Sequence, residues 1–203
     1  MEAFGPRTRE TNMHSKISLS AIALALGFAI ASPLAIAPSY ADMTVMVGGA
    51  PMVPTKNIVE NAVNSKDHTT LVAAVKAAGL VDTLEGPGPF TVFAPTNEAF
   101  AALPKGTVET LLKPENKDKL TAILTYHVVP GRMTAADIAG KIDEMGGKLT
   151  LKTVQGEELA FERWGKSALT VTDAKGDVAR ITIPDVLQSN GVIHVINKVL
   201  IPG

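Results

Sequence analysis

Few side chains in this chain could carry out catalysis, and the histidines are the first to consider because imidazole serves as a base or a metal ligand. There are four, His14, His68, His127 and His194, and there is no cysteine. The sequence has no Gly-x-Ser-x-Gly elbow, no glycine-rich phosphate loop and no histidine pair at the helical spacing of a zinc site. We therefore predict that the protein is not an enzyme and that it holds neither a metal nor a cofactor.

The surroundings of the histidines predict structural roles for them. His68 follows Asp67 at an expected helix start, where a surface position is the usual one. His127 and His194 each interrupt an apolar stretch, so we expect both rings to be buried, neutral and hydrogen bonded. Burial would lower their pKa and make the fold sensitive to acid. A hydrolase that uses His127 or His194 is the functional alternative that these residues leave open.

The stretch that must position these side chains is residues 190–202, a nearly unbroken β-branched run that begins with Asn190 and Gly191. Asn-Gly is typical of a tight hairpin turn, and a strand this apolar is buried on both faces. We predict a central strand entered by a hairpin. Residues 90–95 and 126–130 are apolar stretches of the same kind, and we expect them in the same sheet, supplying the hydrogen-bond partner of His194.

Helical and strand-like patterns divide the rest of the chain. Apolar residues recur at helical spacing between residues 57 and 139, with helix starts at Asp67 and at Thr96 or Asn97, and a helix end at Gly79. From residue 148 onward the apolar period changes to two, which predicts an antiparallel meander with one face in water. Helices followed by strands indicate an α+β domain.

Composition and charge limit the class of partner. The chain has 203 residues, of which 46% are hydrophobic, and its formal net charge is -1. A field that attracts nucleic acid or an anionic membrane surface is therefore not expected. Because there is no cysteine, no disulfide can form, and the fold must be held by its core.

The N-terminal segment has the pattern of a secretory signal peptide. Residues 17–37 are almost wholly apolar, Lys16 precedes them, and Ser39 and Ala41 are the small residues of a cleavage site after Ala41. Met13 is an alternative start, and an uncleaved membrane anchor is the alternative reading of the apolar run. We expect a signal peptide at 1–41, a flexible arm at 42–56 and one folded domain at 57–203. The protein would be secreted or periplasmic, with no membrane span after cleavage.

Three motifs together indicate a family. They are Phe-Thr-Val-Phe-Ala-Pro-Thr-Asn-Glu-Ala-Phe at residues 90–100, Tyr-His-Val-Val at 126–129, and Asn-Gly-Val-Ile-His-Val-Ile-Asn-Lys-Val-Leu at 190–200. In order and spacing they resemble the two signature boxes and the central Tyr-His motif of the fasciclin domain. The chain is similar to small secreted bacterial proteins with a single fasciclin domain, including secreted mycobacterial antigens of this type. The motif residues expected to have structural roles are Phe93, Pro95, Thr96, Phe100, Asn190, Gly191 and His194.

The resemblance implies a fold and a non-catalytic function. The fold would be a twisted β-sandwich, or β-wedge, packed by a cluster of short helices, with mostly antiparallel strands in its C-terminal half. The function would be adhesion to a cell-surface or extracellular matrix component, either protein or polysaccharide. Ile183 stands where animal relatives carry a glutamate. We therefore expect this chain to use the corresponding binding surface but not to bind the integrin partner of those relatives. The binding residues implied in this way are Tyr126, His127, Pro184, Asp185, Val186 and Leu187.

The resemblance also implies an alternative function. Some family members bind carotenoids or other lipophilic molecules between the helices and the sheet. In this chain, such a cleft would be formed by the helical face of Leu71, Val75 and Leu124, or by the methionine-bearing arm. A carrier of a lipophilic small molecule is therefore the second functional hypothesis.

Overall fold

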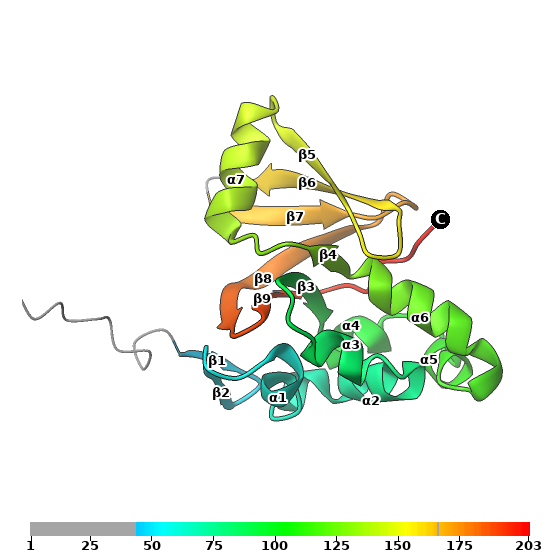
Figure 1. Cartoon of the computed structure of the whole chain (residues 1–203). Helices are drawn as coiled ribbons and strands as arrows, with labels where there is room; N and C mark the ends of the chain where they lie inside the picture. The colour runs from blue at the N-terminus through cyan, green and yellow to red at the C-terminus, as the bar shows by residue number, and fades with distance from the viewer. Residues whose placement is uncertain (1–43, 166) are drawn as a thin grey trace, which may run out of the picture. The chain divides into compact units, whose positions relative to one another are not determined.

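The computed structural model describes residues 44–165 and 167–203. The expected signal peptide at 1–41 and the first residues of the arm lie outside these ranges, so they stay predictions. None of the helices within the ranges is long and apolar enough to cross a membrane. Figure 1 labels seven helices, α1 (Ile58–Ala62), α2 (Thr69–Ala78), α3 (Val81–Glu85), α4 (Asn97–Ala101), α5 (Thr107–Leu111), α6 (Lys117–Tyr126) and α7 (Ala135–Glu144). Two short 3₁₀ helices, η2 (Lys66–His68) and η3 (Pro114–Asn116), lie between them.

The helix boundaries follow from local capping chemistry. Asn57 begins α1 with a capping box, and Thr96 begins α4 by accepting a hydrogen bond from the amide of Ala99. Gly79 ends α2 with a φ of 72°, as the sequence predicted. The predicted cap at Asp67 was wrong, because the chain first makes the short helix η2, and α2 then begins after His68 without a side-chain cap.

The strands form a two-stranded and a seven-stranded sheet. The large sheet has the order β4-β3-β9-β8-β7-β6-β5, and its neighbours are antiparallel except β3 and β9, which are parallel. The predicted strand at residues 190–202 is β9, inside the sheet between β3 and β8, and the expected common sheet with residues 90–95 and 126–130 is confirmed. The strands are β1 (Val45–Val47), β2 (Ala50–Met52), β3 (Phe90–Pro95), β4 (Val128–Pro130), β5 (Lys148–Lys152), β6 (Glu158–Trp164), β7 (Ala168–Thr172), β8 (Val178–Gln188) and β9 (Gly191–Ile196).

The hairpin that enters β9 is confirmed, but its chemistry differs from the prediction. Neither Asn190 nor Gly191 has a positive φ. Asn190 is instead a buried connector: its Oδ1 accepts from the amide of Ile58, and its Nδ2 donates to the carbonyls of Leu84 and Gly86. Gly191 is required for space, because a Cβ there would collide with the backbone of β3 at Phe90.

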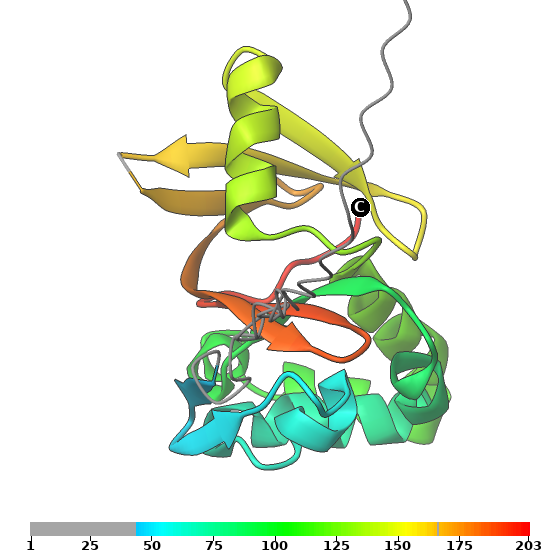
Figure 2. The same cartoon turned by 60° about the vertical axis from the view of Figure 1, so that its left-hand side comes forward.

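Two hydrophobic cores lie on opposite faces of β3 and β9. Because side chains alternate along a strand, Val92 and Ala94 of β3 face one core and Phe93 faces the other. The helix-side core is the cluster that β3, β4 and β9 form with α1, α2, α3, α4 and α6. The meander-side core is the cluster that β5, β6, β7 and β8 form with α7. Figure 2 shows α7 lying across the meander, where it packs against β5 and β6.

The segment expected as an arm contains a hairpin that its sequence pattern did not predict. Strands β1 and β2 pair around a turn at Gly48 and Gly49, and Met52 is buried in the helix-side core. Of the methionines in the described part of this segment, Met52 packs into the domain, whereas Met46 is 58% exposed. The amide of Lys66 donates to the carbonyl of Gly48, so the hairpin lies against η2.

Candidate functional site

The stretch expected to bind a partner lies at an irregularity of β8. Ile183 pairs with Val195 and Val186 pairs with Ile193, so Pro184 and Asp185 together lie opposite the single residue between them on β9. We call Pro184 and Asp185 the β8 bulge. A bulge of this kind bends the strand and redirects its side chains. Asp185 has a φ of 58°, the one positive value among the non-glycine residues of the described ranges.

Contacts on both sides fix the conformation of Asp185. Its Oδ1 accepts a hydrogen bond from the amide of Ala135 at 2.7 Å, and its own amide donates to Nδ1 of His194 at 3.2 Å. Ala135 is the first residue of α7, and a carboxylate is favourable there because the helix N-terminus carries partial positive charge. The bulge is therefore a fixed feature of the surface.

The four residues of the expected binding stretch differ in exposure. Pro184 is exposed, and Asp185 and Leu187 are half-buried. Val186 is only 1% exposed and packs in the helix-side core, so it cannot contact a partner. Pro184, Asp185 and Leu187 are therefore the residues of this stretch that a partner could reach.

His194 is buried behind the bulge. Its ring stacks on Phe93 with centroids 5.5 Å apart, and its Nε2 lies 2.9 Å from the carbonyl oxygen of Met133. Because Nδ1 accepts from Asp185, Nε2 carries the hydrogen and donates to Met133. Burial lowers the pKa of His194, and the Met133 carbonyl and the Asp185 charge partly oppose this.

The expected source of the hydrogen-bond partner of His194 was wrong. Residues 90–95 supply only the stacking ring of Phe93, which the parallel register places beside His194. The polar partners are Asp185 of the bulge and Met133 of the segment between β4 and α7.

Tyr126 and His127 lie in the interior, with 0% and 2% of their surfaces exposed. The Tyr126 hydroxyl donates to the carbonyl of Glu158 and accepts from the amide of Ala174, both at 2.9 Å. A hydroxyl held in this way fixes the end of α6 against the meander. The expectation that these two residues touch a partner directly is withdrawn because neither reaches the surface.

His127 joins α6 to the C-terminal segment. Its Nε2 accepts from the amide of Leu200 at 3.0 Å, so Nδ1 carries the hydrogen and donates to the carbonyl of Ile123 at 2.8 Å. Burial lowers the pKa of His127 to about 4, although the Ile123 carbonyl and the charge of Asp173 favour its protonated form. The ring is therefore neutral at physiological pH.

The remaining motif residues shape the core around these histidines. Phe93 is completely buried and contacts Phe161 across the meander-side core, with centroids 5.1 Å apart. Pro95 is buried and ends β3, Thr96 caps α4, and Phe100 of α4 packs in the helix-side core. These residues build the scaffold: Phe93, Pro95 and Phe100 are buried, and Thr96 is half-buried.

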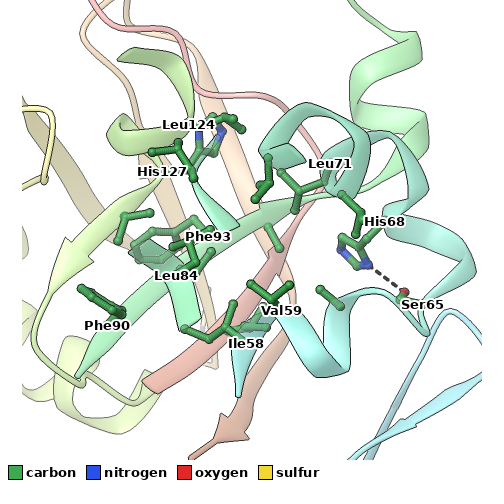
Figure 3. A pocket seen from close by; sticks show the side chains of 18 of the residues that line it. Ile58, Val59, Ser65, His68, Leu71, Leu84, Phe90, Phe93, Leu124 and His127 are labelled. Atoms are coloured by element: carbon green, nitrogen blue, oxygen red, sulfur yellow. Dashed lines mark hydrogen bonds between the residues drawn. The ribbon is translucent and has the colours of Figure 1, made fainter. Parts of the chain in front are cut away.

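An apolar cavity of about 80 Å³ lies in the helix-side core, between the helices and strands β3 and β9 (Figure 3). Leu71, Val75 and Leu124, which the sequence predicted for a cleft, all line it, and so does Met52 of the arm. Its lining is almost wholly apolar, which is typical of a site for a lipophilic group. Phe90 and His68 mark opposite sides of the cavity in the figure.

His68 is one of the few polar side chains in this lining. It is 3% exposed, which corrects the expected surface position, and its Nδ1 lies 2.8 Å from the Ser65 hydroxyl. Burial lowers the pKa of His68, while the Ala94 carbonyl and the charges of Asp67 and Glu98 oppose this. Its Nε2 is buried and has no hydrogen-bond partner among the residues described.

One contributor to the bulge region was missed. Arg132 donates from Nη2 to the carbonyls of Gln188 and Gly191, at 2.8 and 3.0 Å, and so holds the hairpin that carries the bulge. A single arginine after a strand carries no pattern from which this contact could be predicted. Within the ranges described, no three ligating side chains gather in a way that would hold a metal ion.

Known proteins resemble this chain in sequence. Residues 66–202 match the model of the Fasciclin domain. The chain is 48% identical over 181 residues to Protein sll1483 of Synechocystis sp., a match that covers 87% of this chain and 91% of that protein. It is 36% identical over 146 residues to Immunogenic protein MPB70 of Mycobacterium bovis, covering 70% of this chain and 66% of that protein.

A solved structure shows the same architecture. The fold matches a FAS1 domain pair from the insect cell adhesion molecule Fasciclin I with a TM-score of 0.65 and 19% sequence identity. The match covers 73% of this chain and 51% of that chain. The predicted α+β fold, with a twisted, mostly antiparallel sheet and a cluster of short helices, is confirmed.

Proposed function

Because the chain belongs to the fasciclin domain family, we propose that it is a non-catalytic interaction module that binds a cell-surface or extracellular matrix component, protein or polysaccharide. It acts after secretion or in the periplasm, in keeping with the signal-peptide pattern of residues 1–41. The match to a FAS1 pair from an insect cell adhesion molecule supports the fold on which such a module is built.

The observation that carries this proposal is the β8 bulge with Leu187 beside it. Pro184 is exposed, while Asp185 and Leu187 are half-buried, so an apolar area and one carboxylate are presented together. Fixed surfaces bind with little loss of conformational entropy, and Asp185 is fixed by Ala135 and His194. An apolar contact beside a charge provides affinity and orientation.

The histidines support a non-catalytic function. Both ring nitrogens of His127 and of His194 are hydrogen bonded, and at each ring the partners are backbone groups. A general base needs a free nitrogen within reach of a substrate. Nε2 of His68 has no hydrogen-bond partner among the residues described, but the Ser65 hydroxyl donates to Nδ1, so Nε2 carries the ring hydrogen and is not free to act as a base.

Adhesion of bead-bound protein to cells, matrix proteins and polysaccharides tests the bulge surface. The protein is purified from the medium or the periplasm. We expect Leu187→Ser to weaken attachment about fivefold to tenfold, because covering the exposed part of the half-buried Leu187 side chain with a partner contributes about 1 kcal/mol. Met145→Ser is the matched control, because Met145 is 63% exposed and lies at the far end of α7. Equal loss in both variants, or in neither, contradicts the assignment of this surface.

Two substitutions separate the effect of the Asp185 charge on attachment from the effect of its hydrogen bond on stability. Asp185→Asn keeps an oxygen for the amide of Ala135 and tolerates the positive φ, but removes the charge. Asp185→Ala removes the oxygen as well, and we expect it to lower the free energy of unfolding by about 1 kcal/mol. Attachment that is lost in the Asn variant at unchanged stability indicates that the partner recognises the charge.

The cavity favours a second candidate function, the carriage of a lipophilic molecule. Its volume of about 80 Å³ is smaller than the engineered cavity of about 150 Å³ that binds benzene, so as it stands it receives a compact molecule or one end of a larger one. Protein purified from its native source should then yield a coloured or lipid extract. The absence of both would contradict a carrier function.

A further inference from the structure

The cavity of the helix-side core has a polar end. Ser65 and His68 lie at one side of it, and Leu80, Val81 and Phe90, all half-buried, form part of the rest of its lining. Figure 3 shows the hydrogen bond between Ser65 and His68 and the apolar side chains that surround it. A ligand in this cavity would therefore meet two imidazoles in a mostly apolar wall, of which His127 is hydrogen bonded at both nitrogens.

The tautomer of His68 follows from the hydroxyl beside it. The Ser65 hydroxyl is buried, and Nδ1 of His68 is its only hydrogen-bond partner in the part of the chain described here. A buried hydroxyl donates where an acceptor is within reach, so Nδ1 accepts and the ring hydrogen lies on Nε2. His68 thus presents an N–H donor, not a lone pair.

This donor is left without an acceptor. Nε2 makes no hydrogen bond of ordinary geometry within the described ranges, although the Ala94 carbonyl lies near enough to favour the protonated ring. A buried donor without a partner costs about 1 to 3 kcal/mol. The other buried polar side chains of the lining, Ser65 and His127, are already hydrogen bonded, so they offer little to an ordered water beside Nε2.

We propose that this cavity binds a compact, neutral, apolar molecule bearing a carbonyl oxygen, and that His68 Nε2–H donates a hydrogen bond to that oxygen. The proposal rests on the carrier function and names its ligand class. An anion is disfavoured because burying a charge in an apolar wall is costly. A ligand with only donor groups leaves Nε2–H unpaired. A pure hydrocarbon gains the apolar contacts but not the hydrogen bond.

Two probes of the same shape test the role of His68 in the full secreted protein. Acetone carries the acceptor oxygen, and isobutene replaces it with a CH₂ group; both are smaller than benzene. We expect acetone to bind about threefold to tenfold more tightly, the range for one neutral hydrogen bond. In protein labelled with ¹⁵N-histidine, the Nε2 resonance of His68 should shift with the ketone and not with the hydrocarbon. Affinities come from NMR titration.

The variant His68→Phe should bind both probes with equal affinity, since it keeps an apolar ring and removes the donor. Equal binding of the two probes by the unaltered protein overturns the role of His68 but leaves the carrier function standing. Binding of neither probe overturns both. A ketone preference that persists in His68→Phe places the site elsewhere and also overturns the proposal. If this variant does not fold, the Nε2 shift in the unaltered protein decides.

Discussion

The two cores on either side of β3 and β9 are packed to different degrees. In the meander-side core, several large side chains, among them Phe161, Leu159 and Tyr126, have no exposed surface at all. In the helix-side core no member is fully enclosed in this way, and residues such as Val59 and Leu71 are 9% exposed. The apolar cavity lies on the helix side.

The difference shows how one domain separates stability from recognition. The meander-side core is sealed by α7 and by a sheet whose register puts an apolar side chain opposite an apolar side chain, as at Phe161 and Val171. The helix-side core is covered by short helices, of which α1, α3 and α4 have five residues each. These short helices leave an apolar cavity between themselves and the sheet. The imidazole of His68, whose Nε2 has no hydrogen-bond partner among the residues described, lies in the lining of this cavity.

The largest expected effect is that of equal truncations in the two cores. Leu159→Ala removes a completely buried side chain from the meander-side core, and we expect it to lower the free energy of unfolding by about 4 kcal/mol. Leu71→Ala acts on a side chain that already borders the cavity and makes fewer contacts, so its cost should be nearer about 2 kcal/mol. Urea unfolding measures both. Equal costs would show that the two cores are packed alike and would contradict the difference in packing inferred from the structure.

Acid should weaken the fold through the buried histidines. The pKa of His127 is lowered to about 4 in the folded chain, whereas the unfolded chain has the ordinary value of about 6.5. Between these values the unfolded state binds more protons, so the stability is complete above about pH 6.5 and falls as the pH drops towards 4. From pH 7 to pH 5, His127 alone should cost about 2 kcal/mol.

The variant His127→Gln sharpens this prediction because glutamine can accept from Leu200 and donate to Ile123 but does not titrate in this range. Urea unfolding at pH 7 and pH 5 should show a smaller loss of stability in the variant than in the unaltered protein. The pKa values of His68 and His194 are also lowered by burial, so part of the acid sensitivity should persist. An unchanged pH dependence would contradict the burial of His127 as the main cause.

Much of the scaffold follows from local sequence patterns. The strand β9 was predicted from its unbroken apolar run, the end of α2 from Gly79, and the start of α4 from Thr96, because each signal lies within a few residues of its effect. The apolar helix faces that carry Leu71, Val75 and Leu124 were predicted from helical spacing, since an apolar helix face is buried, whereas the cleft beside them was implied by the resemblance.

Features that depend on contacts far along the chain were not predictable in this way. His68 was expected at the surface because Asp67 and a helix start surround it, but the β1–β2 hairpin lies against η2, and a Cβ on Gly48 would collide with the Ser65 hydroxyl. His194 receives its partners from a bulge and a loop, whose positions depend on the register of β8 against β9. Burial of Tyr126 likewise depends on Glu158 and the meander.

The most direct test of unequal packing makes the same addition in both cores, and it includes the smallest single change in stability that we expect. Val59→Ile places one extra methylene group next to the cavity, where it fills empty space, and we expect a gain of up to about 1 kcal/mol in the free energy of unfolding. Val171→Ile places the same group in the sealed meander-side core, where overpacking should cost about 1 to 3 kcal/mol. Urea unfolding under one set of conditions compares the two. Because the chemistry of the substitution is identical, opposite signs can only come from the space available at each site. If Val59→Ile also weakens binding of acetone, the space that it fills is the space in which the ligand binds.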